Sequence, residues 1–155
     1  MAMETIGKYR VVRELGKGAT ATVYLCKDQE LGRQVAVKLV RFGAGASAMS
    51  RRLKKLFQTE GGIARRLDHP NIVAVYEGVV EEGFAYLAME YVEGFALDQY
   101  TRIDRLLPLN RVIGIMFKCC LALDHAYHQG VIHRDIKPAN IMVMAGDEPK
   151  IADFG

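Results

Sequence analysis

Short apolar runs dominate the first ninety residues of the chain. They are rich in Val, Ile, Leu and Tyr, and Gly, Asp and Asn separate them. Runs of this length and composition, bounded by turn residues, are typical of β-strands. The pattern predicts five strands, over residues 9–16, 22–28, 34–41, 72–80 and 84–90.

Three later segments are predicted to be helical. Residues 48–67 carry apolar side chains at helical spacing, and Glu60 lies on the same stripe. Residues 109–129 are apolar nearly all round, so we expect burial on several sides, and Gly130 is expected to end this helix. Charged residues interrupt it, which argues against a membrane span. A short helix is expected over 96–103.

Lys38 has the pattern of a cation placed inside a cleft. On strand parity, Ala36 and Lys38 share one face, and Val35, Val37 and Leu39 share the other. A lysine can also extend into solvent from a strand edge.

Glu60 needs a cationic partner if its stripe is buried, because an unpaired buried charge is costly. Lys38 is the natural partner. The alternative places Glu60 at the edge of the stripe, in solvent.

Three polar residues stand out near the end of the chain: Asp135, Asn140 and Asp153. Apolar runs flank them, and residues 145–149 have the composition of a hairpin connection. Acidic and amide side chains on loops beside a hairpin can converge, so that two hold a divalent cation and the third accepts a proton. The alternative is that Asp135 and Asp153 are solvated loop carboxylates.

The residues around these positions resemble a known family. His-Arg-Asp-x-Lys-Pro-x-Asn over 133–140, followed by Asp-Phe-Gly over 153–155, is similar to the catalytic and metal loops of Hanks-type, eukaryotic-like serine/threonine protein kinases. The resemblance covers 9–155, and the residues at the motif positions are more similar to those of bacterial than of animal members. It implies an α+β, two-lobed fold. A five-stranded antiparallel sheet with one helix would form the N-lobe (1–92), and 93–155 would begin a helical C-lobe.

The resemblance also implies residue roles. Asp135 would accept the proton of the substrate hydroxyl, and Lys137 would neutralise the γ-phosphate of ATP. Lys38, oriented by Glu60, would bind the α- and β-phosphates, and Asn140 and Asp153 would hold Mg²⁺. The ATP pocket would be formed by Leu15, Gly16, Gly18, Val23, Ala36, Lys38, Met89, Glu90, Val92 and Met142. A Gly-x-Gly hairpin by itself is weak evidence for a phosphate loop, and a simple tight turn is the more frequent reading.

Composition limits the remaining function classes. The chain has 155 residues, a formal net charge of +3 and three cysteines. The charge is too small to indicate nucleic-acid binding, and the cysteines do not form a disulfide framework, which favours a reducing compartment. We therefore expect a cytoplasmic location, with no membrane segment in this stretch and any anchor lying downstream.

The resemblance predicts Ser/Thr-containing protein substrates and allows a homodimer through the kinase domain. Because the motif set stops at 155, we expect the chain alone to be inactive in phosphoryl transfer. A pseudokinase or nucleotide-binding scaffold is the alternative, disfavoured because Lys38, Glu60, Asp135, Asn140 and Asp153 are all present. An interaction module without a nucleotide site is the third hypothesis.

Overall fold

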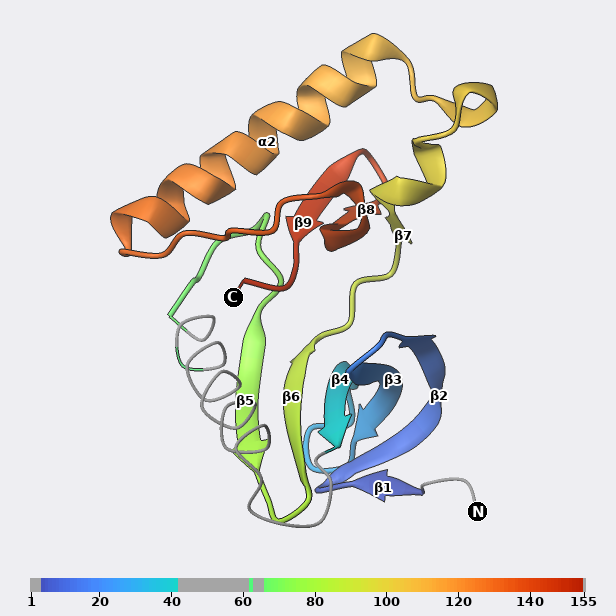
Figure 1. Cartoon of the computed structure of the whole chain (residues 1–155), viewed down its shortest axis with the longest axis vertical. Coiled ribbons are helices and arrows are strands. Elements are labelled where there is room, and N and C mark those ends of the chain that lie inside the picture. Colours follow the sequence, from blue (N-terminus) through green and yellow to red (C-terminus); the bar gives the residue numbers. More distant parts are fainter. Residues whose placement is uncertain (1–3, 42–61, 63–65, 155) are drawn as a thin grey trace. The chain divides into compact units, whose positions relative to one another are not determined.

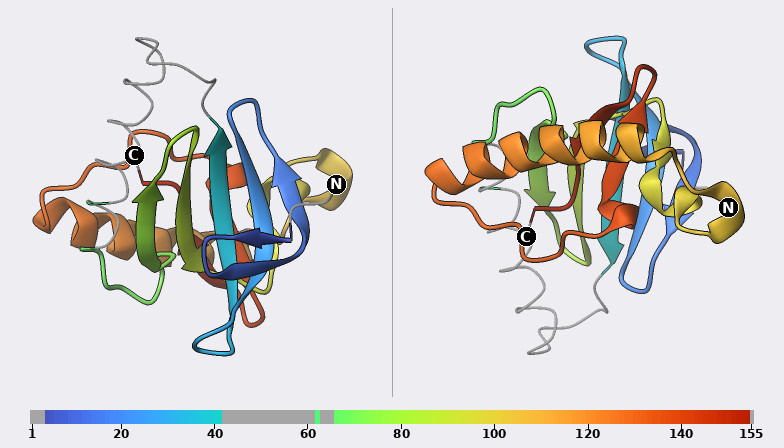
Figure 2. Two further views of the ribbon diagram at one scale, coloured as in Figure 1. Left: turned by 90° about the horizontal axis from the view of Figure 1, so that it is seen from below. Right: turned by 90° about the horizontal axis from the view of Figure 1, so that it is seen from above.

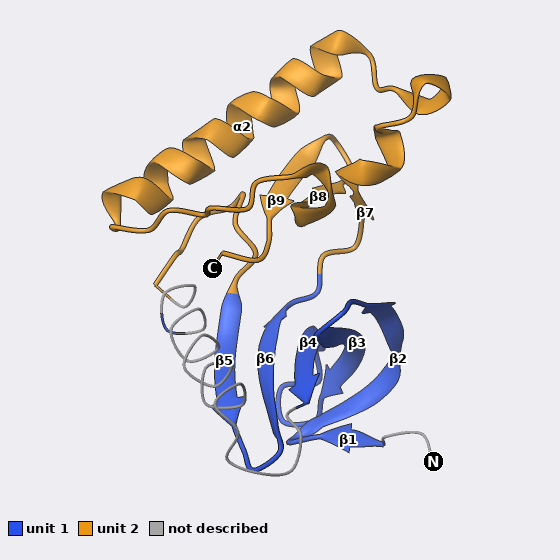
Figure 3. Ribbon diagram, in the orientation of Figure 1, with its two compact units in different colours: residues 1–65, 75–91 blue, residues 66–74, 92–155 orange. Residues whose placement is uncertain are grey.

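The chain divides into two compact units, which we describe separately. The computed structural model describes residues 4–41, 62 and 66–154. The first unit comprises Met1–Arg65 and Val75–Tyr91, and the second comprises Arg66–Ala74 and Val92–Gly155 (Figure 3). The second unit thus includes residues 66–74, and the lobe boundary expected at residues 92–93 stays a prediction.

The described part of the first unit is an antiparallel sheet (Figures 1 and 2). Its strands are β1 (Thr5–Ile6), β2 (Tyr9–Lys17), β3 (Ala21–Asp28), β4 (Gln34–Arg41), β5 (Val75–Val80) and β6 (Phe84–Glu90). Their spatial order is β1-β2-β3-β4-β6-β5. The five predicted strands are all present. The predicted count of five is wrong by one, because the two-residue strand β1 is too short to have a periodic signal.

Alternation along β4 determines which side of this sheet carries the core. Val35, Val37 and Leu39 are at most 2% exposed and belong to one cluster with side chains from β1, β2, β3 and β6. Ala36 and Lys38 lie on the opposite face, as strand parity predicts. The face that carries Lys38 is therefore distinct from the core of the sheet.

The second unit combines a helix with a small sheet. Strands β7 (Phe95–Ala96), β8 (Ile141–Met144) and β9 (Glu148–Ile151) pair in the order β7-β8-β9. Helix α2 (Leu109–His128) packs against β9 (Figure 1). The short helix predicted over 96–103 is not observed as such. Ala96 pairs with β8, and 3₁₀ helices η1 (Leu97–Tyr100) and η2 (Ile103–Arg105) follow.

Residues 71–73 extend the small sheet rather than the large one. Ile72 forms a parallel bridge with Ile151, and the Val73 N–H donates to the Ile151 carbonyl at 2.9 Å. Strand β5 consequently begins at Val75, three residues later than predicted. The backbone of 71–73 is already committed to β9, so this segment belongs to the second unit.

The described residues bury helix α2 along one side only. Ile115, Cys119, Ala122 and Ala126 are buried, whereas Leu109, Ile113 and Phe117 are more than half exposed. The expectation of burial on several sides is therefore not met here. After the helix, Gly130 adopts a positive φ of 75°, as predicted for a terminating glycine.

Two further expectations concern a membrane span and the helix over 48–67. No helix among the described residues has the length and apolarity to span a membrane. The helix predicted over 48–67, including Glu60, lies outside the described residues apart from 62, 66 and 67.

Candidate functional site

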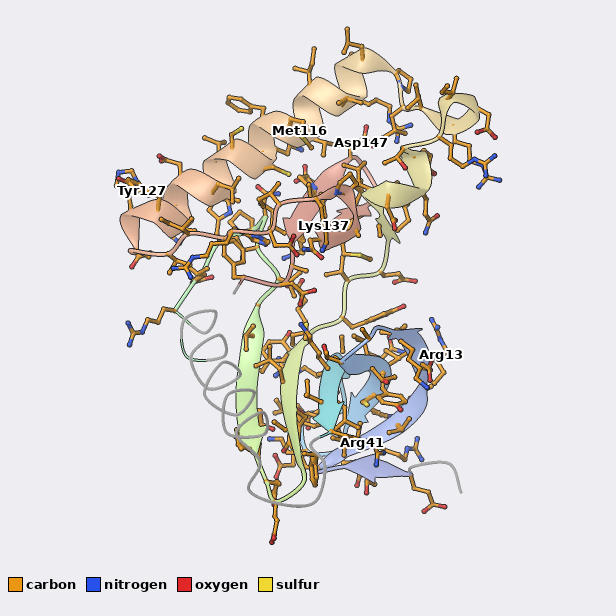
Figure 4. All side chains as sticks on the ribbon, viewed as in Figure 1. Arg13, Arg41, Met116, Tyr127, Lys137 and Asp147 are labelled. Atoms are coloured by element: carbon orange, nitrogen blue, oxygen red, sulfur yellow. The ribbon has the colours of Figure 1, made fainter. Side chains whose placement is uncertain are left out.

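The second unit gathers three of the predicted site residues around one carboxylate. The Lys137 ammonium donates to Oδ2 of Asp135 at 2.7 Å, and Asn140 Nδ2 donates to the same oxygen at 3.2 Å. Lys137 lies below the first half of α2 in Figure 4, on the loop before η3 (Pro138–Asn140). Both donors use Oδ2, so Oδ1 is the carboxylate oxygen that neither occupies.

A second hydrogen bond determines the orientation of the Asn140 amide. Its Nδ2 also donates to the backbone carbonyl of Asp135 at 2.9 Å. A carbonyl oxygen only accepts, so the nitrogen must face Asp135 and the amide oxygen must point away from it. The buried Asn140 side chain therefore presents Oδ1, an oxygen ligand suited to a hard cation.

His133 connects this loop to the residues before Asp153. The Asp135 N–H donates to His133 Nδ1 at 3.2 Å, so Nδ1 carries the lone pair and the ring proton is on Nε2. That Nε2–H donates to the Ala152 carbonyl at 2.8 Å. His133 is 2% exposed and packs edge-on against Phe154, with ring centroids 4.5 Å apart. A buried imidazole thus joins the backbones of Asp135 and Ala152.

Ala152 is held from both sides, which places Asp153 beside Asn140 along the backbone. Its N–H donates to the Asn140 carbonyl at 2.9 Å, and its carbonyl accepts from His133. Asp153 has a positive φ of 58°, a conformation rare for a residue other than glycine. One amide oxygen and one carboxylate on adjoining backbones form a donor set that fits Mg²⁺, whose protein ligands are oxygens.

Local charge keeps Asp135 ionised. The pKa of this carboxyl is lowered from its ordinary value, first by the hydrogen bond from Lys137, while partial desolvation opposes the shift and Asn140 adds to it. The side chain remains accessible, being 58% exposed. An accessible, ionised carboxylate whose Oδ1 is used by neither Lys137 nor Asn140 is suited to orienting a hydroxyl group.

In the first unit, the predicted nucleotide residues share one face of the sheet. Val23 lies directly opposite Lys38 in the β3–β4 pairing, and Ala36 lies opposite Met89 in the β4–β6 pairing. Directly opposed residues in antiparallel strands share a face. Since Ala36 and Lys38 are two residues apart, all four side chains lie on the face opposite the main core. Glu90 follows Met89 at the end of β6.

The glycine-containing connection is a tight β-hairpin. Gly16 pairs with Val23, and the Gly18 N–H donates to the Ala21 carbonyl at 2.8 Å. The register shifts between Glu14 and Gly16, so Leu15 occupies a β-bulge. Such a bulge redirects side chains locally, a feature that the alternation pattern did not predict. Chain neighbours aside, a Cβ at Gly16 would meet no atom of the described residues within 4 Å, and a Cβ at Gly18 would lie 3.5 Å from the Ala21 carbonyl oxygen.

The remaining predicted residues are placed within the second unit or are not described. Val92 is buried just before β7, and Met142 is half-buried in β8, opposite Lys150 and Ala96. Glu60 lies outside the described residues, so its pairing with Lys38 stays a prediction.

Sequence reasoning gave no role to two residues that organise the site. His133 belonged to the quoted motif, and its two ring nitrogens join loops 19 residues apart. Asn71 is 7% exposed and donates to the Pro149 carbonyl at 2.8 Å, supporting the strand that leads to Asp153. In the sequence, Asn71 is recognisable only as a polar residue after a proline turn. The carbonyl that accepts its hydrogen bond lies 78 residues away.

Comparisons with known proteins agree with this arrangement. The protein kinase domain family matches residues 9–155. The chain is 39% identical over 150 residues to the serine/threonine-protein kinase PrkC of Bacillus subtilis, covering 96% of this chain and 22% of the relative. It is 38% identical over 152 residues to PknB of Mycobacterium leprae, covering 96% and 24%.

Among solved structures, the PknI kinase domain of Mycobacterium tuberculosis is similar with a TM-score of 0.80 and 35% identity, over 97% of this chain and 60% of that one. The chain spans about a quarter of the length of the curated relatives it matches. A family match that extends over nearly all of the sequence, together with the geometry of 133–154, shows that the chain belongs to the protein kinase family.

Proposed function

We propose that the chain forms the nucleotide-binding and catalytic-loop portion of a serine/threonine protein kinase, which transfers the γ-phosphoryl group of ATP to a protein hydroxyl. The observation that carries this proposal is the hydrogen-bonded cluster of Asp135, Lys137 and Asn140, tied through Ala152 to Asp153. Positioning and charge neutralisation provide most of the catalysis in phosphoryl transfer.

The contacts of each residue in the cluster support the role proposed for it. Oδ1 of Asp135 orients the Ser or Thr hydroxyl and takes its proton as the oxygen attacks the γ-phosphorus. The bond from that phosphorus to the β–γ bridging oxygen breaks, and ADP leaves. Lys137, already at Oδ2, supplies positive charge near the transferred group.

The cation site is proposed at Asn140 and Asp153. Magnesium held there with ATP would neutralise charge developing on the phosphate oxygens. Asn140 is suited to this role because its Nδ2 is committed to Asp135, so that Oδ1 is presented to a cation. In the first unit, Lys38 would bind the α- and β-phosphates, with Val23, Ala36 and Met89 on the same sheet face against the adenine.

Ser/Thr specificity is proposed on two grounds. Lys137 lies two residues after Asp135, a position where tyrosine kinases usually carry Ala or Arg. The curated relatives cited above are named serine/threonine-protein kinases. Phosphoamino-acid analysis of autophosphorylated protein of full natural length should give phosphoserine or phosphothreonine. Predominant phosphotyrosine would contradict this assignment.

The central experiment separates nucleotide binding from chemistry. Mg²⁺·ATP should raise the melting temperature of the chain, and Lys38→Met or Asp153→Ala should reduce that shift. Asp135→Asn should preserve the shift yet lower phosphotransfer by the protein of full natural length by about 10²–10⁴-fold, the usual contribution of a general base. Undiminished turnover in Asp135→Asn, or no ATP-dependent shift in the wild type, would overturn the proposal.

A further inference from the structure

Two ion pairs hold the β8–β9 hairpin on helix α2. The Arg111 guanidinium makes a two-bond contact with Asp147, with Nε donating to Oδ2 at 2.9 Å and Nη2 donating to Oδ1 at 2.6 Å. Two helical turns further along α2, Lys118 pairs with Glu148. Asp147 lies at the hairpin tip, next to α2 (Figure 4). Paired, parallel hydrogen bonds of this kind constrain geometry more than a single contact does.

The two cations lie on the same stripe of α2 as its buried side chains. Arg111 and Lys118 are seven residues apart, two helical turns, and Ile115 between them is fully buried. On the hairpin side, Pro149 and Ile151 are buried in β9, which packs against α2. The hairpin is therefore anchored by an apolar contact along β9 and by charged contacts at its tip.

The backbone of the hairpin loop adopts a conformation that the contact between Arg111 and Asp147 can stabilise. Met144 pairs with Glu148, which leaves a three-residue loop over 145–147. Asp147 has a φ of 58° and follows Gly146 with a φ of 75°. Left-handed backbone is unfavourable for a residue with a Cβ, although Asp tolerates it better than most. Within the 145–147 loop, Asp147 is the non-glycine residue with a positive φ, and Arg111 binds its side chain.

The loop conformation is coupled to the cation site through strand register. The turn of a hairpin determines which residues of the two strands pair, and a slip of one residue turns every side chain to the other face. In the observed register Ile151 pairs with Ile141, and the next N–H, that of Ala152, donates to the Asn140 carbonyl. The relative position of Asn140 and Asp153 thus depends on the register that the 145–147 loop determines.

We propose that Arg111 is a positioning residue for the cation site: by clamping Asp147, it holds the β8–β9 register that places Asp153 beside Asn140. This inference rests on the proposed role of Asn140 and Asp153 as magnesium ligands. Arg111 itself touches neither substrate nor cation, and acts from the opposite end of the hairpin. Lys118 makes a second contact with the hairpin, a single ion pair with Glu148 that constrains its geometry less.

The test combines amide exchange with cation affinity, measured on the 155-residue chain. In Arg111→Met and in Asp147→Asn, the Ala152 amide should exchange about 10-fold faster, the change that corresponds to losing a charge-assisted contact. The Val131 amide, bonded to the Ala126 carbonyl at the end of α2, serves as the internal reference and should not change. Mn²⁺ binding in the presence of ATP, followed by electron paramagnetic resonance, should also weaken by about 10-fold, because the same lost contact then loosens the relative position of Asn140 and Asp153.

Matched variants separate positioning from general destabilisation. Arg102→Met removes an arginine from a similar ion pair, with Asp104 at 3.1 Å, away from the hairpin, and should alter neither readout. Arg111→Lys keeps the charge without the two-bond geometry and should be intermediate. If Arg111→Met does not fold, Asp147→Asn decides, because asparagine accepts the left-handed backbone.

Failure of this inference can be distinguished from failure of the proposed function. Equal acceleration of the Ala152 and Val131 amides, or an unchanged Ala152 amide, would overturn the inference. So would faster Ala152 exchange with unaltered Mn²⁺ affinity. Failure of the wild-type chain to bind Mn²⁺·ATP would refute the proposed function instead.

Discussion

At the scale of single residues, charge around Asp135 controls its protonation. The pKa of this carboxyl is lowered mainly by the Lys137 hydrogen bond. A carboxyl whose folded pKa is depressed contributes stability above its unfolded pKa and loses it as pH falls through the folded pKa. Asp135 should therefore remain ionised to a lower pH than an ordinary aspartate.

Replacing Lys137 by Met should raise the pKa of Asp135 towards its ordinary value. Carboxyl-carbon chemical shifts recorded as a function of pH would report the midpoint directly. Lys118→Met is the matched control, because Lys118 is the main cause of the lowered pKa of Glu148 and should shift that residue instead. An Asp135 midpoint that is the same with and without Lys137 would contradict the assigned cause.

Gly94 is required by close approach of two backbones. A Cβ at this position would meet the carbonyl group of Val143, with its carbon at 2.8 Å and the Met144 nitrogen at 3.2 Å. Backbone atoms in a paired strand have little room to shift, so Gly94→Ala should lower the free energy of unfolding by about 1–3 kcal/mol, the usual cost of overpacking. Denaturant titration measures this change.

Gly114 is the control substitution for Gly94. It lies within α2, and among the described residues a Cβ there would meet no atom within 4 Å apart from those of its own helical backbone and chain neighbours. Gly114→Ala should therefore stabilise the chain by up to about 1 kcal/mol through helix propensity. A loss of stability at Gly114 equal to that at Gly94 would show that the close approach is not the cause.

At the scale of elements, α2 turns two adjacent cysteines to different environments. Cys119 is 4% exposed on the side that faces β9, and Cys120 is exposed. Burial raises the pKa of the Cys119 thiol to about 11, and burial likewise raises that of Cys26 in β3 to about 11. A buried, protonated thiol reacts slowly because the thiolate is the nucleophile.

Brief alkylation at neutral pH should modify Cys120 well before Cys26 or Cys119. Peptide mass spectrometry after a short exposure to N-ethylmaleimide would quantify the three sites, and unfolded chain would supply the intrinsic rates. Modification of Cys119 as fast as Cys120 would show that α2 does not bury this face in solution.

At the scale of the whole molecule, α2 leaves an apolar row exposed. Leu109, Ile113, Phe117 and Leu121 follow one another at intervals of four residues and are 73%, 59%, 64% and 48% exposed. Residues at this spacing lie on one side of a helix, and contiguous exposed apolar side chains favour association.

The 155-residue chain should therefore bind a hydrophobic dye and self-associate as its concentration rises. Phe117→Glu should reduce both dye fluorescence and the apparent mass measured by sedimentation. Leu31→Glu, at an isolated apolar residue that is 64% exposed, is the control and should have little effect. Equal effects of the two substitutions would show that the row on α2 is not responsible.

The pattern of apolar and polar residues predicted those strands and helices whose formation depends on their own residues. Alternation predicted β2, β3, β4 and β6 to within a residue or two at each end, and apolar spacing predicted α2 to within one residue. It did not predict β1, which is two residues long, or β7, where Ala96 is a strand residue only because β8 lies beside it. The late start of β5 has the same reason, since the backbone of 71–73 bonds to β9.

The sequence by itself determined the family, the order of its motifs and the residue types available for chemistry, because these depend on composition and spacing along one segment. Tertiary structure decided which atoms act. It assigned Oδ2 of Asp135 to Lys137, turned the Asn140 amide oxygen away from Asp135 and put the His133 proton on Nε2. It also paired Arg111 with Asp147, 36 residues apart. Such contacts join side chains that are distant in sequence, and their geometry exists only after the strands and α2 have packed together.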